Sequence, residues 1–231
     1  MGGEELERVA EWMLERLFVR RDCYGLSTAD GLVTVKRPVT TETILGHLRG
    51  WYEVGAHVTV PGESRCLWLC IDCDRPAALR AHAETCRVFP REATMLELTG
   101  GRGAHVWLLF RTKVPSEIAY VIAHAIARRV PGAEAFPKQP YLPSGYGHFV
   151  RVPLGMRQST GRWSKLLWPK SVFDVEPCLP GDYIRIDRLD VPPVPWQVRR
   201  ERCVFRRGET CLHDLDFPGD CVPERCPAMR R

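Results

Sequence analysis

The sequence lacks any apolar segment long enough to cross a lipid bilayer. Its longest nearly apolar run, residues 118–127, includes a histidine and is far shorter than the roughly 20 residues that a transmembrane helix requires. The first residues are acidic and show neither the basic start nor the apolar centre of a signal peptide. We therefore expect a cytoplasmic protein with no membrane partner.

Low-complexity segments and internal repeats are also absent, which excludes a solenoid and argues against a disordered chain. Of the 231 residues, 45% are hydrophobic and 26% are charged, the composition of a globular protein. Because a single domain spans ~100–200 residues, the chain has room for one core and a small appendage. We expect the first helix and strand of the core at residues 1–38, its main body at 39–180, and a proline-rich linker with a cysteine-rich tail at 181–231.

Neither sign of charge is in large excess, since 33 Lys and Arg residues face 28 Asp and Glu residues, a net charge of +5. The basic surplus lies in the last third of the chain. It permits a polyanionic partner such as a nucleic acid but does not require one, because solvated surface charges explain the same composition.

Helix and strand patterns interleave without regular alternation, which favours an α+β fold with a mixed sheet over a doubly wound one. The continuous apolar character of residues 66–72 indicates a strand buried on both faces. A second helix follows the capping residues 40–43 and ends near Gly50 or Gly55. Further helices are predicted at residues 4–18, 76–88 and 116–129, and further strands at 97–99, 104–110 and 149–154.

Two aspartates stand at the end of the apolar strand. Asp72 and Asp74 are two residues apart, so the pleat points both carboxylates to one side while Ile71 and Cys73 face the other. Such a pair can hold the divalent metals of phosphoryl transfer. The Asp-x-Asp step is not specific on its own, because it also occurs in glycosyltransferases and nucleases and often only caps the following helix.

A glycine-rich turn at residues 99–105 joins the next two predicted strands. Its three glycines allow backbone N–H groups to converge on an anion, while Arg102 and His105 supply side-chain donors. A plain hairpin turn is the alternative, but it needs neither the arginine nor a polar histidine at the start of an apolar strand. The loop therefore indicates a phosphate-binding site.

Several short blocks, in this order, resemble the archaeo-eukaryotic primases, particularly the compact primase-polymerase modules of TOTE conflict systems and their CRISPR-associated relatives. Together they extend over about two thirds of the chain. The blocks are TTETILGHLRG (residues 40–50), LCIDCD (69–74), LTGGRGAHVW (98–107), EAFPKQ (134–139) and GHFVRVPLG (147–155).

The resemblance implies a catalytic core related to the RNA-recognition motif, with a mixed sheet, flanking helices and the metal site at the sheet edge. In that family the acidic pair binds two catalytic metals, Mg²⁺ or Mn²⁺, so Asp72 and Asp74 are the expected ligands. The glycine-histidine loop of the family holds the triphosphate of the incoming nucleotide. The nucleotide-binding residues expected here are Thr99, Gly101, Arg102, Gly103, His105, Lys138 and Arg151.

A third carboxylate completes the metal site of the family. We assign it to Glu134, which stands just ahead of residues 136–139, where the resemblance places an acidic residue. Asp174 is the alternative ligand, and an ordinary surface charge is the simpler explanation of either residue.

Other basic and aromatic residues admit two interpretations. Lys138 and Arg151 are predicted phosphate or template contacts, or else ordinary exposed cations. A basic stretch interleaved with tryptophans suits the stacking of unpaired bases, although buried core tryptophans would give the same pattern. That stretch contains Arg157, Arg162, Trp163, Lys165 and Trp168. His47 is expected to belong to the packing of its helix and not to catalysis.

The tail has too few apolar residues to form a core of its own. Metal binding by four thiolates would supply the missing folding energy. The candidate ligands are Cys203, Cys211, Cys221 and Cys226. None of their spacings is a Cys-x-x-Cys step, so Zn²⁺ and a [4Fe–4S] cluster both stay open, with unligated cysteines as the alternative. Cysteines in the predicted sheet and its helix are expected to be buried small hydrophobes: Cys66, Cys70, Cys73 and Cys86.

The function expected from these features is template-directed nucleotidyl transfer by a DNA primase or primase-polymerase. Its partners would be a single-stranded DNA template, NTPs or dNTPs, and a separate helicase or other replication or CRISPR protein, because no helicase motif is present. The alternatives are a gap-filling polymerase of end joining, a non-catalytic nucleic-acid-binding accessory module of replication, and a metal-dependent nuclease.

Overall fold

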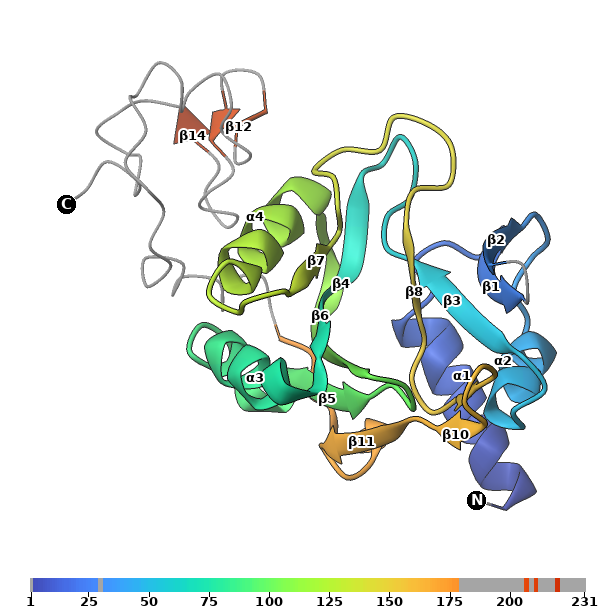
Figure 1. Ribbon diagram of the computed structural model, residues 1–231. Helices are drawn as coiled ribbons and strands as arrows, with labels where there is room; N and C mark the ends of the chain where they lie inside the picture. Colours follow the sequence, from blue (N-terminus) through green and yellow to red (C-terminus); the bar gives the residue numbers. More distant parts are fainter. Residues whose placement is uncertain (1, 29–30, 179–205, 208–209, 212–218, 221–231) are drawn as a thin grey trace.

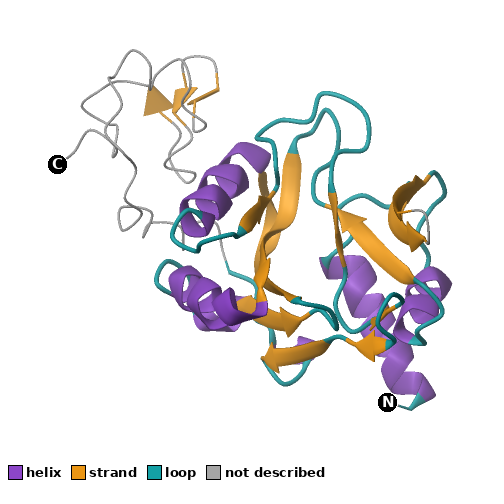
Figure 2. Ribbon diagram, in the orientation of Figure 1, coloured by secondary structure: helices purple, strands orange, loops and turns teal. Residues whose placement is uncertain are grey.

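The computed structural model describes residues 2–28 and 31–178 and three short backbone segments at 206–207, 210–211 and 219–220. Two antiparallel sheets form the framework of the molecule (Figures 1 and 2). The larger sheet has the strand order β11-β5-β6-β4-β7, and the smaller has the order β2-β1-β3-β8. Helices cover one side of each sheet, so the chain has the expected α+β class.

The strands of the larger sheet are β4 (Arg65–Asp74), β5 (Thr94–Leu98), β6 (Gly103–Pro115), β7 (Glu134–Phe136) and β11 (Lys165–Trp168). Those of the smaller sheet are β1 (Tyr24–Thr28), β2 (Gly31–Val35), β3 (Glu53–His57) and β8 (Phe149–Arg151). A separate hairpin joins β9 (Met156–Arg157) to β10 (Arg162–Trp163). The helices are α1 (Gly3–Arg16), α2 (Thr41–Leu48), α3 (Ala78–Cys86) and α4 (Ser116–Ala127), with short 3₁₀ turns η1 (Arg75–Ala77), η2 (Arg91–Ala93) and η3 (Val172–Asp174).

The expectation of a mixed sheet was wrong for the strands that the structure describes. Each pairing between them is antiparallel, and the one parallel contact is an isolated bridge between Phe110 and Cys178. The continuous apolar run of β4 has another cause than a parallel sheet. Helices α3 and α4 pack against this strand, and the indole N–H of Trp68 donates to the Leu17 carbonyl at the end of α1 at 2.7 Å, so the strand is enclosed from two sides.

The local predictions for the helices are confirmed. The apolar stripe of α1 is buried at Val9, Ala10 and Met13. Thr40 caps α2 in a reciprocal pair with Thr43, and the chain leaves this helix at Gly50, whose φ of +76° favours glycine. The predicted helix at residues 76–88 is shorter than expected, because its first turn is η1 and α3 begins only at Ala78.

None of the described helices has the length and apolarity needed to span a bilayer. In the tail, the structure describes β12 (Arg206–Arg207), β13 (Thr210–Cys211) and β14 (Gly219–Asp220), which pair as a small antiparallel sheet. Cys203, Cys221 and Cys226 lie outside the described residues, and of Cys211 only the backbone is described. The four-cysteine metal site therefore stays a prediction.

Trp68 offers a test of how α1 is attached to the larger sheet. Its ring is fully buried and meets Trp107 edge to face, with 4.7 Å between ring centroids. We expect Trp68→Phe to lower the free energy of unfolding by ~1–3 kcal/mol, because the Leu17 carbonyl loses the shorter of its two hydrogen bonds and keeps only the one from the Val19 N–H at 3.3 Å. Urea denaturation measures the change. Trp51→Phe is the matched control, since Trp51 is 65% exposed and its replacement should change stability by less than ~0.5 kcal/mol; equal effects would contradict the assignment.

Candidate active site

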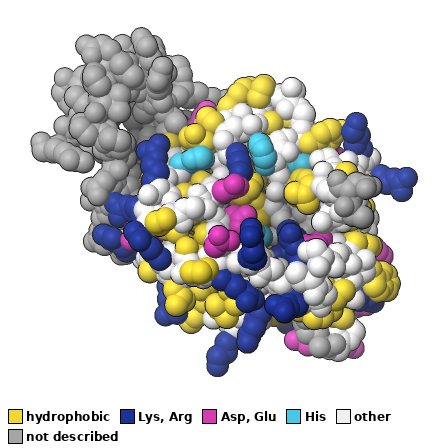
Figure 3. Space-filling view, in the orientation of Figure 1, with side chains coloured by type: hydrophobic (Ala, Val, Ile, Leu, Met, Phe, Trp, Pro, Cys, Tyr) yellow, Lys and Arg dark blue, Asp and Glu magenta, His cyan; other side chains and the backbone are white. Residues whose placement is uncertain are grey.

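A cavity of about 1160 Å³ opens between the two sheets and is lined by residues from both. Acidic side chains gather near the centre of this face of the molecule, with basic side chains around them (Figure 3). The larger sheet contributes Asp72, Asp74, His105, Glu134 and the glycine loop. The smaller sheet contributes Val54, Gly55, Phe149 and Arg151, among others. Segments far apart in the chain thus meet in one cavity.

Four charged or polar residues form a row across the larger sheet, which we call the acidic row. In the strand register, Glu97 of β5 lies opposite His105 of β6, His105 opposite Asp72 of β4, and Asp72 opposite Glu134 of β7. Directly paired residues of antiparallel strands point to the same face, so the four side chains share one side of the sheet. The next row on that face, two residues along, is mostly apolar: Met95, Trp107, Cys70 and Phe136.

The two aspartates of β4 lie as the alternation of the strand predicted. Ile71 and Cys73 are buried on the opposite face, while Asp72 is half-buried and Asp74 is exposed. Asp74 stands opposite Gly103, at the end of the glycine loop. Both carboxylates line the cavity, so the pair faces the same space as the loop.

Glu134 also lines the cavity, but its carboxylate forms an ion pair with Lys138 on the same side of the sheet. Asp174 lies in η3 and is not among the residues that line the cavity. Glu134 is therefore better placed than Asp174 to act together with Asp72, because it lies directly across from it on the neighbouring strand.

The donor atoms of Asp72, Asp74 and Glu134 are carboxylate oxygens, which are the ligands that Mg²⁺ and Mn²⁺ prefer. Within the described part of the chain, no three His, Cys, Asp or Glu side chains are close enough together to form a ready metal site. The pairing of Glu134 with Lys138 is one reason, since it directs this carboxylate to a cation of the protein. The oxygen ligands of the three residues fit a hard divalent cation. Their side chains are not yet close enough together to bind one ion jointly.

The electrostatics of Asp72 also favour a cation nearby. Burial raises the pKa of Asp72, and the neighbouring Glu134 raises it further, while His105, Lys138 and Arg151 act in the opposite direction. A raised pKa means that the charged form of Asp72 is disfavoured, and a cation bound between the two carboxylates would offset that cost.

The glycine loop is a tight hairpin that also faces the cavity, so the two interpretations of its sequence are compatible. The backbone N–H and the hydroxyl of Thr99 both donate to the Gly103 carbonyl, at 3.1 and 3.0 Å. Gly100 has a φ of +74°, and a Cβ there would lie 2.4 Å from the Arg162 carbonyl oxygen, so this position requires glycine. Thr99, Gly101, Arg102 and Gly103 line the cavity, as expected of residues that could contact phosphate.

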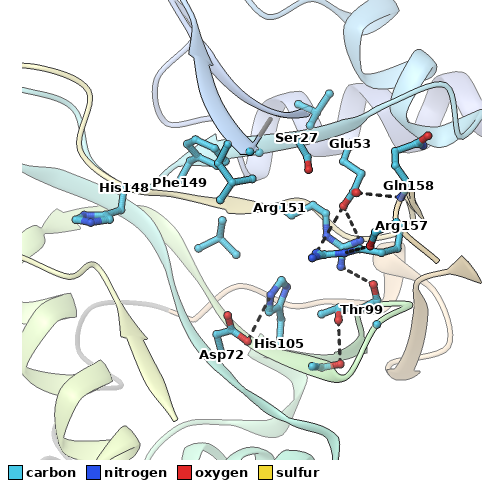
Figure 4. A pocket seen from close by; sticks show the side chains of 18 of the residues that line it. Ser27, Glu53, Asp72, Thr99, His105, His148, Phe149, Arg151, Arg157 and Gln158 are labelled. Atoms are coloured by element: carbon cyan, nitrogen blue, oxygen red, sulfur yellow. Dashed lines mark hydrogen bonds and ion pairs between the residues drawn. The ribbon is translucent and has the colours of Figure 1, made fainter. Parts of the chain in front are cut away.

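His105 lies between two carboxylates. Its Nδ1 is 3.3 Å from Glu97 Oε2, and its Nε2 is 3.8 Å from Asp72 Oδ1 on the cavity side (Figure 4). Glu97 was not expected from the sequence; it is fully buried and also accepts from the indole N–H of Trp107 at 3.3 Å. Burial acts to raise the pKa of Glu97, but the neighbouring His105, the charge of Arg151 and a hydrogen bond from Ser164 outweigh it, so its pKa is lowered and the carboxylate stays charged. The signal for it was a charged residue in the apolar strand Thr94–Leu98.

Arg151 was expected to be a phosphate contact or an exposed cation, and the second alternative was wrong. Its side chain is only 9% exposed and lies 3.3 Å from Glu53 and 3.9 Å from Glu97. Its Nη2 donates to the Thr99 carbonyl at 2.7 Å (Figure 4). Glu53, a second buried carboxylate missed in the sequence, accepts from the backbone N–H of Gln158 and pairs with Arg157 at 3.7 Å. The guanidinium of Arg151 thus joins β8, β3, β5 and the glycine loop.

Of the two tryptophans predicted to be available for stacking, Trp163 is exposed and Trp168 is not. Trp163 is 49% exposed on β10. Trp168 instead donates its indole N–H to the Arg91 carbonyl, and the guanidinium of Arg91 lies 3.7 Å over its ring, so its face is covered.

The remaining predictions concern buried side chains. His47 is fully buried, accepts from the Val54 N–H and lies 3.0 Å from the Pro153 carbonyl, so its expected packing role is confirmed. Cys66, Cys70 and Cys73 are buried as expected, and burial raises the pKa of the Cys66 and Cys73 thiols to about 11. Cys86 is only partly buried.

One family model matches more than half of the chain. The model of the archaeo-eukaryotic primase domain of TOTE conflict systems matches residues 26–168. Among solved structures, the AEP domain of the cyanophage S-2L primase-polymerase has a TM-score of 0.54 at 15% identity, and the match covers 79% of this chain and 97% of that one. The polymerase domain of Mycobacterium tuberculosis Ligase D, solved in complex with DNA, has 17% identity over 69% of this chain and 75% of that one, and its TM-score of 0.38 is too low to establish a shared fold. No curated protein matches the sequence significantly.

The role of Arg151 between buried carboxylates can be tested by substitution. We expect Arg151→Gln to lower the free energy of unfolding by roughly 3–5 kcal/mol, because it leaves the buried Glu97 without an arginine and the buried Glu53 with only the more distant Arg157. The matched control is Arg157→Gln, which removes a half-exposed partner of the same Glu53 and should change stability by ~0–1 kcal/mol. Urea denaturation of both variants measures the difference, and a loss below 1 kcal/mol for Arg151→Gln would refute the bridging role.

Proposed function

The chain belongs to the archaeo-eukaryotic primase domain family of TOTE conflict systems, and we propose that it catalyses template-directed nucleotidyl transfer on single-stranded DNA. In this reaction a 3′-hydroxyl attacks the α-phosphate of a nucleotide paired to the template, a new phosphodiester bond forms, and pyrophosphate leaves. The observation that supports the proposal is the row of Asp72, His105 and Glu134, which faces the same cavity as the glycine loop.

The protein's own residues would bind and orient the triphosphate of an NTP or dNTP. Arg102 and Lys138 both line the cavity and would neutralise phosphate charge. His105 directs Nε2 towards the cavity while Nδ1 faces Glu97, so its ring is held in one orientation for a phosphate or ribose contact. Arg151 would act through the loop, since it holds the Thr99 carbonyl.

Asp72, Asp74 and Glu134 would hold the divalent cations. When bound, Mg²⁺ or Mn²⁺ would supply activation of the 3′-hydroxyl and neutralisation of the triphosphate charge. Lys138 pairs with Glu134 in the described structure, and a triphosphate is a competing partner for this lysine. A nucleotide that binds Lys138 would then free Glu134 to bind a metal, and a metal bound by Glu134 would free Lys138 to bind the nucleotide.

The metal assignment is tested with the two aspartates of β4. We expect Asp72→Ala with Asp74→Ala to abolish primer extension, because the carboxylates that concentrate divalent cations are gone, while the thermal melting midpoint stays near that of the wild type. Mn²⁺ binding followed by electron paramagnetic resonance should weaken in parallel, which gives a readout independent of turnover. Asp174→Ala is the matched control and should retain both activities, since Asp174 lies outside the cavity lining. Wild-type extension by the double variant would overturn the assignment.

Primer dependence separates a primase from a gap-filling polymerase. We expect labelled dinucleotides to form from nucleotides and unprimed single-stranded DNA in the presence of Mn²⁺, because the family whose model matches this chain is one of primase domains. Products would be resolved on denaturing gels with Asp72→Ala as the negative control. Extension that occurs only on primed or gapped templates would favour the gap-filling alternative, and strand cleavage without synthesis would favour a nuclease.

A further inference from the structure

Two segments that are distant in the sequence meet at one end of the cavity. Residues 49–52 follow α2, and the hairpin of β9 and β10 lies against them. The Gln158 side chain donates to the Gly50 carbonyl at 3.0 Å, and a Cβ on Gly50 would lie 3.1 Å from the Trp163 ring and 3.2 Å from Met156. The two segments are therefore fixed to one another. We call this surface the aromatic rim, and its residues are Arg49, Trp51, Arg157, Arg162 and Trp163.

The tryptophans of the aromatic rim are not part of the core. Trp51 is 65% exposed and Trp163 is 49% exposed, whereas Trp68 and Trp107 are fully buried. The guanidinium of Arg49 lies over the Trp51 ring at 5.3 Å from its centroid, farther than Arg91 lies from the Trp168 ring at 3.7 Å, so a cation accompanies a ring that is still largely exposed. Exposed aromatic rings beside cations suit a ligand that offers flat rings and negative charge together.

The charges of the rim are mostly basic. Glu53 follows directly after these residues, but it is only 2% exposed and is paired with Arg151 and Arg157. Arg49 and Arg162 are exposed at the surface. The rim therefore presents positive charge to solvent, which is complementary to phosphate groups.

The rim is continuous with the cavity. Trp51, Arg157 and Gln158 line the same cavity as Asp72 and His105. Figure 4 shows Gln158 and Arg157 beside Glu53 and Arg151, across from Asp72 and His105. A chain of nucleotides that lies on the rim would thus enter the cavity that contains the acidic row.

We propose that the aromatic rim binds single-stranded nucleic acid as the template. Unpaired bases stack on Trp51 and Trp163, and phosphates contact Arg49 and Arg162. This assignment rests on the proposed function for the identity of the strand as template, but the binding itself depends only on the exposed rings and cations. Trp51, and not the Trp168 expected from the sequence, is the second stacking ring, because the guanidinium of Arg91 lies 3.7 Å over the Trp168 ring.

The binding is tested by fluorescence anisotropy with a labelled oligothymidylate, which forms no duplex, on the full chain. We expect Trp51→Ala and Trp163→Ala each to weaken binding at least about fivefold, as the loss of one stacked base does. Arg49→Gln with Arg162→Gln should reduce the slope of log affinity against log salt by about 1–2. A duplex competitor should displace the oligothymidylate poorly, because its bases are not available for stacking.

Phe173→Ala is the matched control. Phe173 is 41% exposed with Arg8 at 5.0 Å over its ring, so it copies the exposed aromatic and cation of the rim, and it lies outside the cavity lining. This variant should bind as the wild type does. Binding by Trp51→Ala with Trp163→Ala within twofold of the wild type would overturn the proposal, as would an equal loss in Phe173→Ala; either result would leave the rim as a surface for another partner, such as a protein.

Primer extension separates failure of the rim from failure of the proposed function. If the wild-type protein binds the oligonucleotide through the tryptophans but extends no primer, the proposed function fails and the rim stands as a binding surface. If the wild type extends primers and the double tryptophan variant shows an unchanged KM for template, the rim fails and the proposed function stands. The supporting result is extension with a KM for template raised at least about fivefold in the variant.

Discussion

A single buried guanidinium holds the two sheets in their relative positions. Arg151 extends from the smaller sheet towards Glu97 of the larger one, and on its own side it meets Glu53. A buried carboxylate that loses its cation is strongly destabilising, so neither sheet can shift without exposing or stranding a charge. The same guanidinium holds the Thr99 carbonyl, which fixes the glycine loop relative to both sheets. The contacts of Arg151 therefore join both walls of the cavity to the glycine loop.

Local patterns in the sequence were enough to predict much of the framework. The apolar stripe of α1, the Thr40 cap of α2 and the apolar run that ends at Asp72 depend on residues within a few positions of each other. The alternation of β4 likewise placed Asp72 and Asp74 on one side. The glycine loop pointed to His105, and the resemblance to the primases added Glu134. The strand register shows why both belong with Asp72: each is its direct neighbour on an adjoining strand.

What the sequence could not predict depends on contacts between distant segments. Glu97 looks like a solvent-facing residue of a short strand, and only the pairing of β5 with β6 places it under His105. Arg151 looks like an exposed cation until β3 and β5 enclose it with two carboxylates. The sequence around Trp51 and Trp168 does not show which of the two rings is open. Trp168 is covered because η2 places Arg91 over its ring. The contact partners of these residues cannot be found from a fixed spacing in the sequence, because the number of residues between partners depends on the lengths of the loops.

The two sheets contribute to the cavity in different ways. The larger one presents the row of Asp72, His105 and Glu134, whereas the smaller one presents a ring, Phe149, that is packed against glycines. Gly25 and Gly55 are direct partners on β1 and β3, and the Phe149 ring lies on both of them; a Cβ at either position would stand 2.3 Å from that ring. A methyl group there would push the ring away from the sheet and towards the cavity that it lines. The open volume therefore depends on two glycines, just as the charge within it depends on the acidic row, and Arg151 keeps the two in register.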